Sequence, residues 1–332
     1  MAYLSSPTFM ISSLRLSHLI GLVAASLAST TFSATEVDPA LPEYQTTGGV
    51  SGSLISIGSD TLNNLMTFWA EGFRAKYPNV SIQIEGKGSA TAPPALIEGT
   101  AQLGPMSREM KQEEIDAFET KFGYKPTAIR VAVDALAVFA HKDNTLKGLN
   151  VAQVDAIFSS TRKLGAPADL SDWGQAGIPA WNGRAISLYG RNSASGTYGF
   201  FKEAALGKGD FKASVKEQPG SSAVVQGVSA DEFGLGYSGI GYITSGVRTL
   251  PIAAEGTEYA EPSYENCLDG SYPLARFLYI YINKAPGKPL NATTAEFLKF
   301  IISKQGQEIV VKDGYYPLPA ELASEVSSSL AP

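Results

Sequence analysis

Three segments rich in glycine, serine and threonine each join an apolar strand pattern to a helix pattern along this chain. They occupy residues 58–61, 86–91 and 191–197. Apolar or alternating residues precede each segment, as in strands, and a helix pattern follows it. A chain that alternates strands and helices in this way favours parallel sheets covered by helices. We therefore predict an α/β fold.

The third segment, residues 191–197, has the composition of an anion site. Ser195 and Thr197 are good helix N-caps, and Gly196 allows close approach of the backbone. A helix start leaves about four N–H groups unpaired and carries roughly half a positive charge. An oxyanion there would meet N–H donors, two hydroxyls and the guanidinium of Arg191. A capped helix with a surface arginine is the alternative for this segment alone. The recurrence of three such junctions favours an oxyanion site, because a buried anion needs many donors.

Charge and length narrow the range of partners. The 332 residues include 26 Lys and Arg against 32 Asp and Glu, a formal net charge of −6. This balance argues against nucleic acid or an anionic membrane surface as a partner. It does not exclude a small anion, because nearby N–H donors outweigh distant surface charge. The length is sufficient for a core divided between two domains.

Residues 1–28 are predicted to be a cleavable signal peptide. Arg15 precedes an apolar stretch at residues 19–28, which is too short to anchor the chain in a bilayer. The stretch ends in the small-x-small pattern of a cleavage site. We expect cleavage after Ala28, with Ala34 as the alternative.

A single cysteine, Cys267, supports a soluble periplasmic protein. It leaves no lipid-acceptor cysteine after the signal and no partner for an intramolecular disulfide. Residues 29–49 are predicted to be a flexible lead-in to the folded part.

Two features of the sequence predict where the chain crosses between domains. Asp134-Ala135 separates the apolar runs 129–133 and 136–140, and a second run punctuated by glycine covers residues 235–243. The expected division is a first lobe of residues 50–133 and 239–320, a second lobe of residues 134–238, and a tail of residues 321–332. Helices are predicted at residues 112–122, 151–158, 294–302 and 306–312.

Catalysis finds little support in the sequence. After removal of the signal peptide, His141 is the only histidine, and it ends an apolar strand pattern, where a structural role is usual. No Gly-x-Ser-x-Gly motif occurs at a strand–helix turn with plausible partners. One histidine and one cysteine cannot build a common zinc site. We expect no enzyme activity, no metal and no cofactor.

Taken in order, six motifs make the chain similar to the phosphate-binding component of bacterial high-affinity phosphate ABC transporters. The similarity covers nearly everything from Leu54 to Pro319. The motifs lie at residues 58–61, 86–89, 103–108, 189–197, 236–242 and 306–310. The resemblance implies the two-lobed periplasmic binding protein fold of type II. In that fold each lobe is a mixed sheet flanked by helices, and two crossover strands join the lobes, which close on one ligand.

The resemblance also implies a set of phosphate-binding residues. It places Thr61 and the Leu62 N–H at the first helix start and Ser89 at the second, with the residues around Arg191 on the opposite lobe. The whole expected set is Thr61, Leu62, Ser89, Ser107, Arg108, Asp134, Arg191, Ser195, Gly196 and Thr197.

Two positions depart from the family pattern. Several relatives carry an aspartate that accepts a proton-bearing phosphate oxygen where this chain has Ser107-Arg108. The acidic residue that often pairs with the ligand arginine is Ser193 here. Asp134 and Asp60 are the remaining candidates for the proton acceptor. Asp134 lies between two apolar strands and is predicted to face the cleft, with a turn or capping role as the alternative. Asp60 is interpreted as a helix cap.

The function implied by the resemblance is capture of inorganic phosphate in the periplasm and its delivery to an inner-membrane ABC permease. We expect a monomer that binds no nucleic acid. Two alternatives stay open. One is a binding protein for another tetrahedral oxyanion, such as sulfate or arsenate, and the other is a secreted phosphatase built on the same fold.

Overall fold

The computed structural model describes residues 35–330. The first stretch of the chain forms β1 (Gly52–Gly58), η1 (Asp60–Leu62), α1 (Asn63–Lys76), β2 (Val80–Gly86), η2 (Ser89–Thr91), α2 (Ala92–Glu98), β3 (Gly104–Met106), α3 (Gln112–Phe122) and β4 (Thr127–His141). The middle forms β5 (Leu149–Asn150), α4 (Val151–Phe158), α5 (Trp173–Ala176), η3 (Pro179–Trp181), β6 (Ser187–Arg191), α6 (Gly196–Ala204), β7 (Lys216–Gln218), α7 (Ser221–Ser229) and β8 (Gly234–Gly239). The last stretch forms η4 (Ile240–Tyr242), β9 (Val247–Leu250), β10 (Ile252–Ala253), α8 (Tyr264–Leu268), β11 (Ala275–Ile282), α9 (Ala292–Ile302), α10 (Lys304–Lys312) and α11 (Ala320–Leu330).

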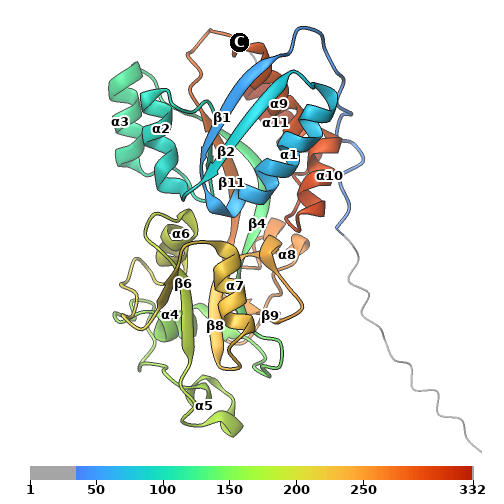
Figure 1. The fold of residues 1–332 in the computed structure, drawn as a ribbon. Coiled ribbons are helices and arrows are strands. Elements are labelled where there is room, and N and C mark those ends of the chain that lie inside the picture. Colours follow the sequence, from blue (N-terminus) through green and yellow to red (C-terminus); the bar gives the residue numbers. More distant parts are fainter. Residues whose placement is uncertain (1–34, 331–332) are drawn as a thin grey trace, which may run out of the picture. The chain divides into compact units, whose positions relative to one another are not determined.

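Strand β4 belongs to both lobes. Its first part, from Thr127 to Ala135, pairs antiparallel with β11, and its second part, from Leu136 to Ala140, pairs antiparallel with β8. Figure 1 shows β4 and β11 running between a lobe that contains β1, β2 and α1–α3 and a lobe that contains α4–α7, β6 and β8. The predicted break at Asp134-Ala135 is therefore a continuous strand that crosses from one lobe to the other.

In the first lobe, a two-stranded parallel sheet packs against helices. Strands β1 and β2 pair from Gly52–Val80 to Gly58–Gly86, and the ends of both strands lead into short 3₁₀ turns. The apolar face of α1 is buried, as its spacing predicts, and Trp69 donates a hydrogen bond of 2.8 Å to the carbonyl of Gly306 on α10. This packing fixes the carboxyl ends of β1 and β2.

In the second lobe, β6 lies between the parallel strands β7 and β8. Phe201 of α6 stacks on Tyr237 of β8, with ring centroids 3.9 Å apart and an interplanar angle of 6°. Phe158 of α4 packs edge-on against both rings. This aromatic cluster holds the start of α6 next to the carboxyl end of β6, where Arg191 lies.

The return to the first lobe comes later than the sequence pattern predicts. Strand β8 ends at Gly239 opposite Leu136, and the chain then turns through η4. Strand β9 next pairs with Val138–His141, in the second part of β4. Residues 247–250 therefore lie with the second lobe, whereas the expected division placed them in the first. The pattern was misleading because a strand that ends at the lobe junction has the same apolar, glycine-punctuated sequence whether the chain crosses or turns back. Strand β11 makes the crossing.

In the described parts of the lead-in and the tail, residues 35–49 and 321–330, the chain makes packing contacts that the sequence does not predict. Leu41 is buried, and the Tyr44 hydroxyl bonds Tyr77 at 2.8 Å and Glu296 at 2.9 Å. The expected tail forms helix α11, which buries Ala323 and Val326. Both segments dock because they carry apolar anchors that match the surface of the first lobe. The predicted signal peptide of residues 1–28 lies outside the described residues.

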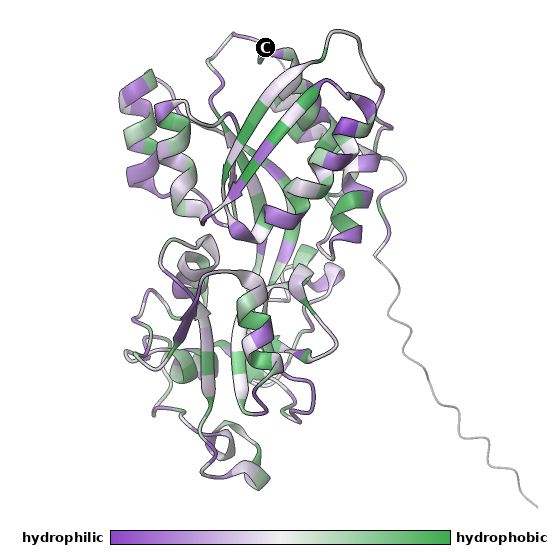
Figure 2. Cartoon of the chain, in the orientation of Figure 1, coloured by the Kyte–Doolittle hydropathy of each residue, from purple (hydrophilic) through white to green (hydrophobic). Residues whose placement is uncertain are grey.

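The surface helices are amphipathic. Figure 2 shows hydrophilic and hydrophobic residues together on α1 and α3, and Phe118 is the buried residue of α3. Within residues 35–330, no helix is both long enough and apolar enough to cross a bilayer.

Candidate anion-binding site

The three Gly/Ser/Thr segments meet where the lobes approach each other. Ser59 caps η1, its Oγ accepting the Thr61 N–H at 3.2 Å. Ser195 caps α6, its Oγ accepting the Thr197 N–H at 3.1 Å and the Tyr198 N–H at 3.4 Å. These four Ser and Thr side chains are almost completely buried. The predicted N-cap role of Ser195 is confirmed, and the serine and threonine hydroxyls of both turns lie inside the protein.

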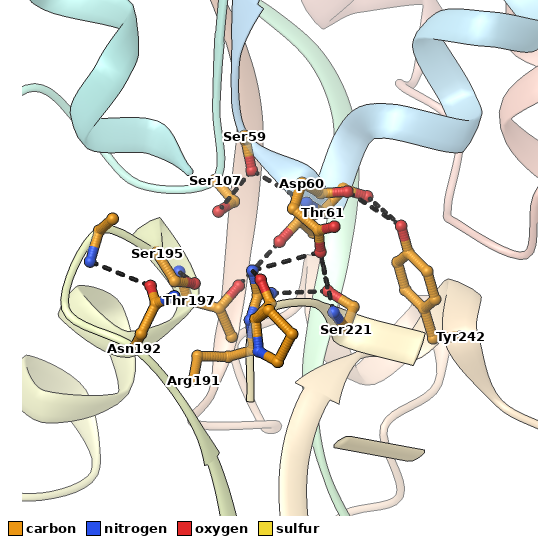
Figure 3. A network of polar contacts seen from close by, with 12 residues as sticks. Ser59, Asp60, Thr61, Ser107, Arg191, Asn192, Ser195, Thr197, Ser221 and Tyr242 are labelled. Atoms are coloured by element: carbon orange, nitrogen blue, oxygen red, sulfur yellow. Dashed lines mark hydrogen bonds and ion pairs between the residues drawn. The ribbon is translucent and has the colours of Figure 1, made fainter. Parts of the chain in front are cut away.

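Hydroxyl groups of the two lobes touch directly. The Oγ1 atoms of Thr61 and Thr197 are 2.9 Å apart. Gly196 faces Ser107 and Ser89 so closely that an added Cβ would lie 2.6 Å from the Ser107 Oγ and closer still to the Ser89 Oγ. Figure 3 shows Ser107 and Thr61 facing Thr197 across the junction. The absence of a side chain at position 196 therefore permits the first lobe to reach the start of α6.

Arg191 is the first of two buried arginines at the junction. Its side chain is 1% exposed, its Nη1 donates to the Ser221 Oγ at 2.7 Å, and its Nη2 lies 3.2 Å from the Asp60 Oδ2. Burial lowers the pKa of Arg191, and the Asp60 carboxylate opposes that shift. Its Nε is buried and has no hydrogen-bond partner among residues 35–330. The Nε–H thus remains for another acceptor.

Arg276 is the second buried arginine, and the sequence reasoning missed it. From β11 its Nε donates to the Asp134 Oδ2 at 2.8 Å, its Nη1 to the Ser107 carbonyl at 2.8 Å and its Nη2 to the Thr197 Oγ1 at 2.9 Å. Its Cζ lies 5.3 Å from the centre of the Phe200 ring. The available signal was an arginine at the start of the apolar run of residues 275–282, where a buried charge requires a partner.

Asp134 is bonded through both carboxylate oxygens. Its Oδ1 accepts the Ile240 N–H at 3.0 Å, and its Oδ2 lies 2.7 Å from Nη2 of Arg276. The residue is completely buried and holds Arg276 at the junction.

Asp60 caps a helix, as interpreted from the sequence, but the helix belongs to the other lobe. Its Oδ2 accepts the Ser221 N–H of α7 at 2.8 Å and the Ser221 hydroxyl at 3.0 Å. Ser59, rather than Asp60, caps the turn that follows β1.

The remaining predicted residues divide into two groups. Leu62, the last residue of η1, is completely buried, and the Ser107 N–H donates to the Ser89 Oγ at 3.1 Å, so these three lie in the first-lobe part of the junction. Arg108 lies apart from them. Its Nη1 and Nη2 each bond Glu114 of α3 at 2.7 Å, and Nη1 also bonds the Glu109 carbonyl at 2.8 Å. The structure thus brings the predicted residues together, except for the Arg108 guanidinium.

The polar cluster consists of hydroxyls, N–H groups and two guanidinium groups. In the part of the chain that the structure describes, no group of three or more His, Cys, Asp or Glu side chains could hold a metal ion. The donor set suits an oxyanion, because both guanidinium groups and the start of α6 favour negative charge.

The sequence of this chain aligns over nearly its whole length with that of a known protein. The phosphate-binding protein PstS of Pseudomonas aeruginosa is 58% identical over 318 residues, which cover 95% of this chain and 98% of the relative. The chain belongs to the PstS family. A sequence profile described as a PBP superfamily domain also matches residues 44–305. The resemblance drawn from the six motifs is therefore confirmed.

Solved structures of proteins from phosphate ABC transporters share the fold. A phosphate ABC transporter substrate-binding protein from Clostridium perfringens, solved with bound phosphate, is 26% identical with a TM-score of 0.68, covering 80% of this chain and all of that one. An ABC-type phosphate transport receptor from Vibrio cholerae is 21% identical with a TM-score of 0.63 over the same shares of the two chains. The predicted type II binding protein fold is confirmed.

Proposed function

We propose that this chain binds inorganic phosphate between its two lobes and delivers it to the permease of an ABC transporter. The observation that carries the proposal is the convergence of two buried arginines, Arg191 and Arg276, with hydroxyls from both lobes at the junction. A small tetrahedral anion has several acceptor oxygens, and donors approaching from several directions suit it. The phosphate-binding relatives support the same ligand.

The proposed binding residues are those that the structure brings together. Arg191 contributes charge and its Nε–H, which has no partner in the described part of the chain, and the start of α6 contributes N–H groups that favour an anion. Thr61 and Thr197 contribute hydroxyls from opposite lobes. Because donors come from both lobes, phosphate would bind the closed arrangement better and shift the population toward it.

We add Arg276 to the proposed phosphate-binding residues and remove Arg108 from them. Arg276 directs one Nη toward Thr197 inside the junction, whereas the Arg108 guanidinium is engaged by Glu114. We assign Asp134 the role of holding Arg276, because both of its oxygens already accept hydrogen bonds. This assignment replaces the predicted role of Asp134 as acceptor of the ligand proton.

We also propose that the protein is periplasmic, is a monomer and has no catalytic activity. A capture protein for an ABC permease acts on the outer side of the inner membrane, where the predicted signal peptide would direct it.

Calorimetric titration of the purified protein with phosphate, arsenate and sulfate tests the proposal. We expect tight binding of phosphate and weaker binding of sulfate. A titration without heat from phosphate would refute the proposed ligand, and equal affinity for sulfate would widen it to tetrahedral oxyanions in general. Release of phosphate from a model ester would instead favour the phosphatase alternative.

A further inference from the structure

Asp60 links the two lobes through one carboxylate oxygen. It lies in η1 of the first lobe, directly after Ser59, and its Oδ2 bonds the Ser221 N–H, the Ser221 hydroxyl and Arg191 at 2.8, 3.0 and 3.2 Å. Ser221 and Arg191 both belong to the second lobe, at the start of α7 and at the end of β6. Figure 3 shows the three residues side by side.

Helix α7 lacks a side-chain cap of its own. Its N-cap residue is Gly220, which offers no acceptor, so the first N–H of the helix meets Asp60 from the opposite lobe. A negative charge is favoured at a helix start, because the N–H groups there have no intrahelical partners. A Cβ on Gly220 would lie 3.0 Å from the Asp60 Oδ1, so the glycine also makes room for the carboxylate.

Asp60 also neutralises the arginine of the candidate site. Ser221 bridges the pair, since its Oγ accepts from the Arg191 Nη1 at 2.7 Å and donates to the Asp60 Oδ2 at 3.0 Å. Position 193, close to Arg191 in sequence, is a serine. The carboxylate that pairs with Arg191 therefore comes from the other lobe and can pair only when the lobes meet.

Two tyrosines hold the turn that carries Asp60. The Tyr315 hydroxyl donates to the Thr61 carbonyl at 2.9 Å, and the Tyr242 hydroxyl donates to the Asp60 carbonyl at 3.0 Å. The backbone of this turn is thus fixed, and the carboxylate is presented to the second lobe in a defined position.

We propose that Asp60 is a positioning residue that latches the lobes around the bound anion and slows its release. The inference rests on the proposed function and deepens it. In a separated state Arg191 has lost this carboxylate, so an incoming anion meets an uncompensated guanidinium. In the closed state Asp60 returns to Arg191 and to the start of α7, and its charge-assisted hydrogen bonds must break before the lobes separate. The latch therefore acts on dissociation more than on association.

Phosphate exchange kinetics of Asp60→Asn test the latch. Radiolabelled phosphate is bound and then displaced with excess unlabelled phosphate, which gives the dissociation rate, and equilibrium dialysis gives Kd. We expect dissociation about tenfold faster or more, the size of one lost charge-assisted hydrogen bond, with an association rate that is equal or higher. Glu71→Gln is the matched control, because it removes one negative charge from the exposed face of α1 in the same lobe.

Gly220→Ala provides an independent second variant. Gly220 has an extended backbone with φ of −143°, which alanine adopts without strain, so α7 should fold normally. The added Cβ would lie 3.0 Å from the Asp60 Oδ1 in this arrangement of the lobes, and the proposal implies that the contact ends when the lobes separate. Faster phosphate release from this variant, with an unchanged melting temperature, is the expected result. An unchanged dissociation rate in both Asp60→Asn and Gly220→Ala would overturn the proposal.

Amide hydrogen exchange separates this inference from the proposed function. The Ser221 N–H is followed in the wild type and in Asp60→Asn, with and without saturating phosphate. We expect protection in the wild type and faster exchange in Asp60→Asn, while Glu71→Gln behaves as the wild type. Equal protection in all three proteins overturns the latch, whatever the ligand. A wild type that retains no phosphate in dialysis refutes the proposed function, and the exchange result still decides the latch.

Discussion

The hydroxyls of Thr61 and Thr197 lie 2.9 Å apart, although 136 residues separate them in the chain. Thr61 follows β1 in one lobe, and Thr197 lies in the first turn of α6 in the other. Arg276, which donates to the same Thr197 hydroxyl, adds a cation to the contact. The distance between these two threonine hydroxyls therefore shows whether the lobes are together.

Gly196→Ala should block closure while leaving the fold intact. The added Cβ would overlap the Ser89 and Ser107 hydroxyls, but alanine is fully compatible with the first turn of a helix. Overpacking of this kind costs about 1–3 kcal/mol, so we expect phosphate affinity to fall about tenfold or more, as measured by calorimetry. Gly48→Ala, where a Cβ meets no atom within 4 Å, is the control. Unaltered affinity in Gly196→Ala would show that the lobes need not approach this closely.

Arg191→Ala should weaken phosphate binding by about 2–5 kcal/mol, because it removes a desolvated cation from the proposed site. Arg191→Lys should also bind weakly, since a compact ammonium does not reproduce the guanidinium fork. Calorimetry measures both variants. Near wild-type affinity in Arg191→Ala would place the anion elsewhere.

Arg276→Gln should destabilise the protein strongly on its own. It would leave the completely buried Asp134 carboxylate without its cation, which costs about 3–5 kcal/mol. The double variant Asp134→Asn/Arg276→Gln should recover part of that loss, because no unpaired charge remains. Urea unfolding of the two single variants and the double variant measures the coupling. If the double variant is stable but binds phosphate weakly, Arg276 contributes to the ligand as well as to the fold.

Asp313 should make stability decrease as the pH rises. Burial raises the pKa of this carboxyl to about 7, and its Oδ2 accepts no hydrogen bond from residues 35–330. Between about pH 4 and about pH 7 the folded chain therefore holds a proton that the unfolded chain has lost, and this advantage is lost as the pH rises through about 7. Asp313→Asn should thus gain in melting temperature over the wild type toward neutral pH. Glu308→Gln, an exposed position of α10, controls for the change in net charge. A constant difference between Asp313→Asn and the wild type across this pH range would contradict the prediction.

Local patterns in the sequence predict much of the fold. The helices expected at residues 112–122 and 151–158 coincide with α3 and α4. Both carry strong end signals. Gly123 ends α3 in the left-handed conformation, and Asn150 begins α4 with a reciprocal capping box. Signals of this kind depend on neighbours within a few residues, so a single sequence contains them.

The features that escaped prediction depend on partners distant in sequence. The role of Arg276 depends on its hydrogen bond to Asp134, which lies 142 residues away in the chain. The role of Asp60 depends on its hydrogen bond from Ser221, which lies 161 residues away. Nothing within a few residues of Asp60 distinguishes a cap of its own turn from a cap of a helix in the other lobe. The docking of Tyr44 likewise depends on Glu296, on a helix near the other end of the chain.

The continuity of β4 through both lobes limits how the molecule can open. Since the single strand β4 runs through the junction at Asp134, pairing with β11 before it and with β8 after it, the lobes cannot part by translation, and opening would be a rotation about β4 at the junction. Displacement in such a rotation grows with the lever arm. Arg276 lies on β11 and is bonded to Asp134 of β4, so it would hardly move. Asp60 would move away from the start of α7. Arg276 would then keep its position in both the open and the closed state, whereas movement of Asp60 would open and close access to the anion.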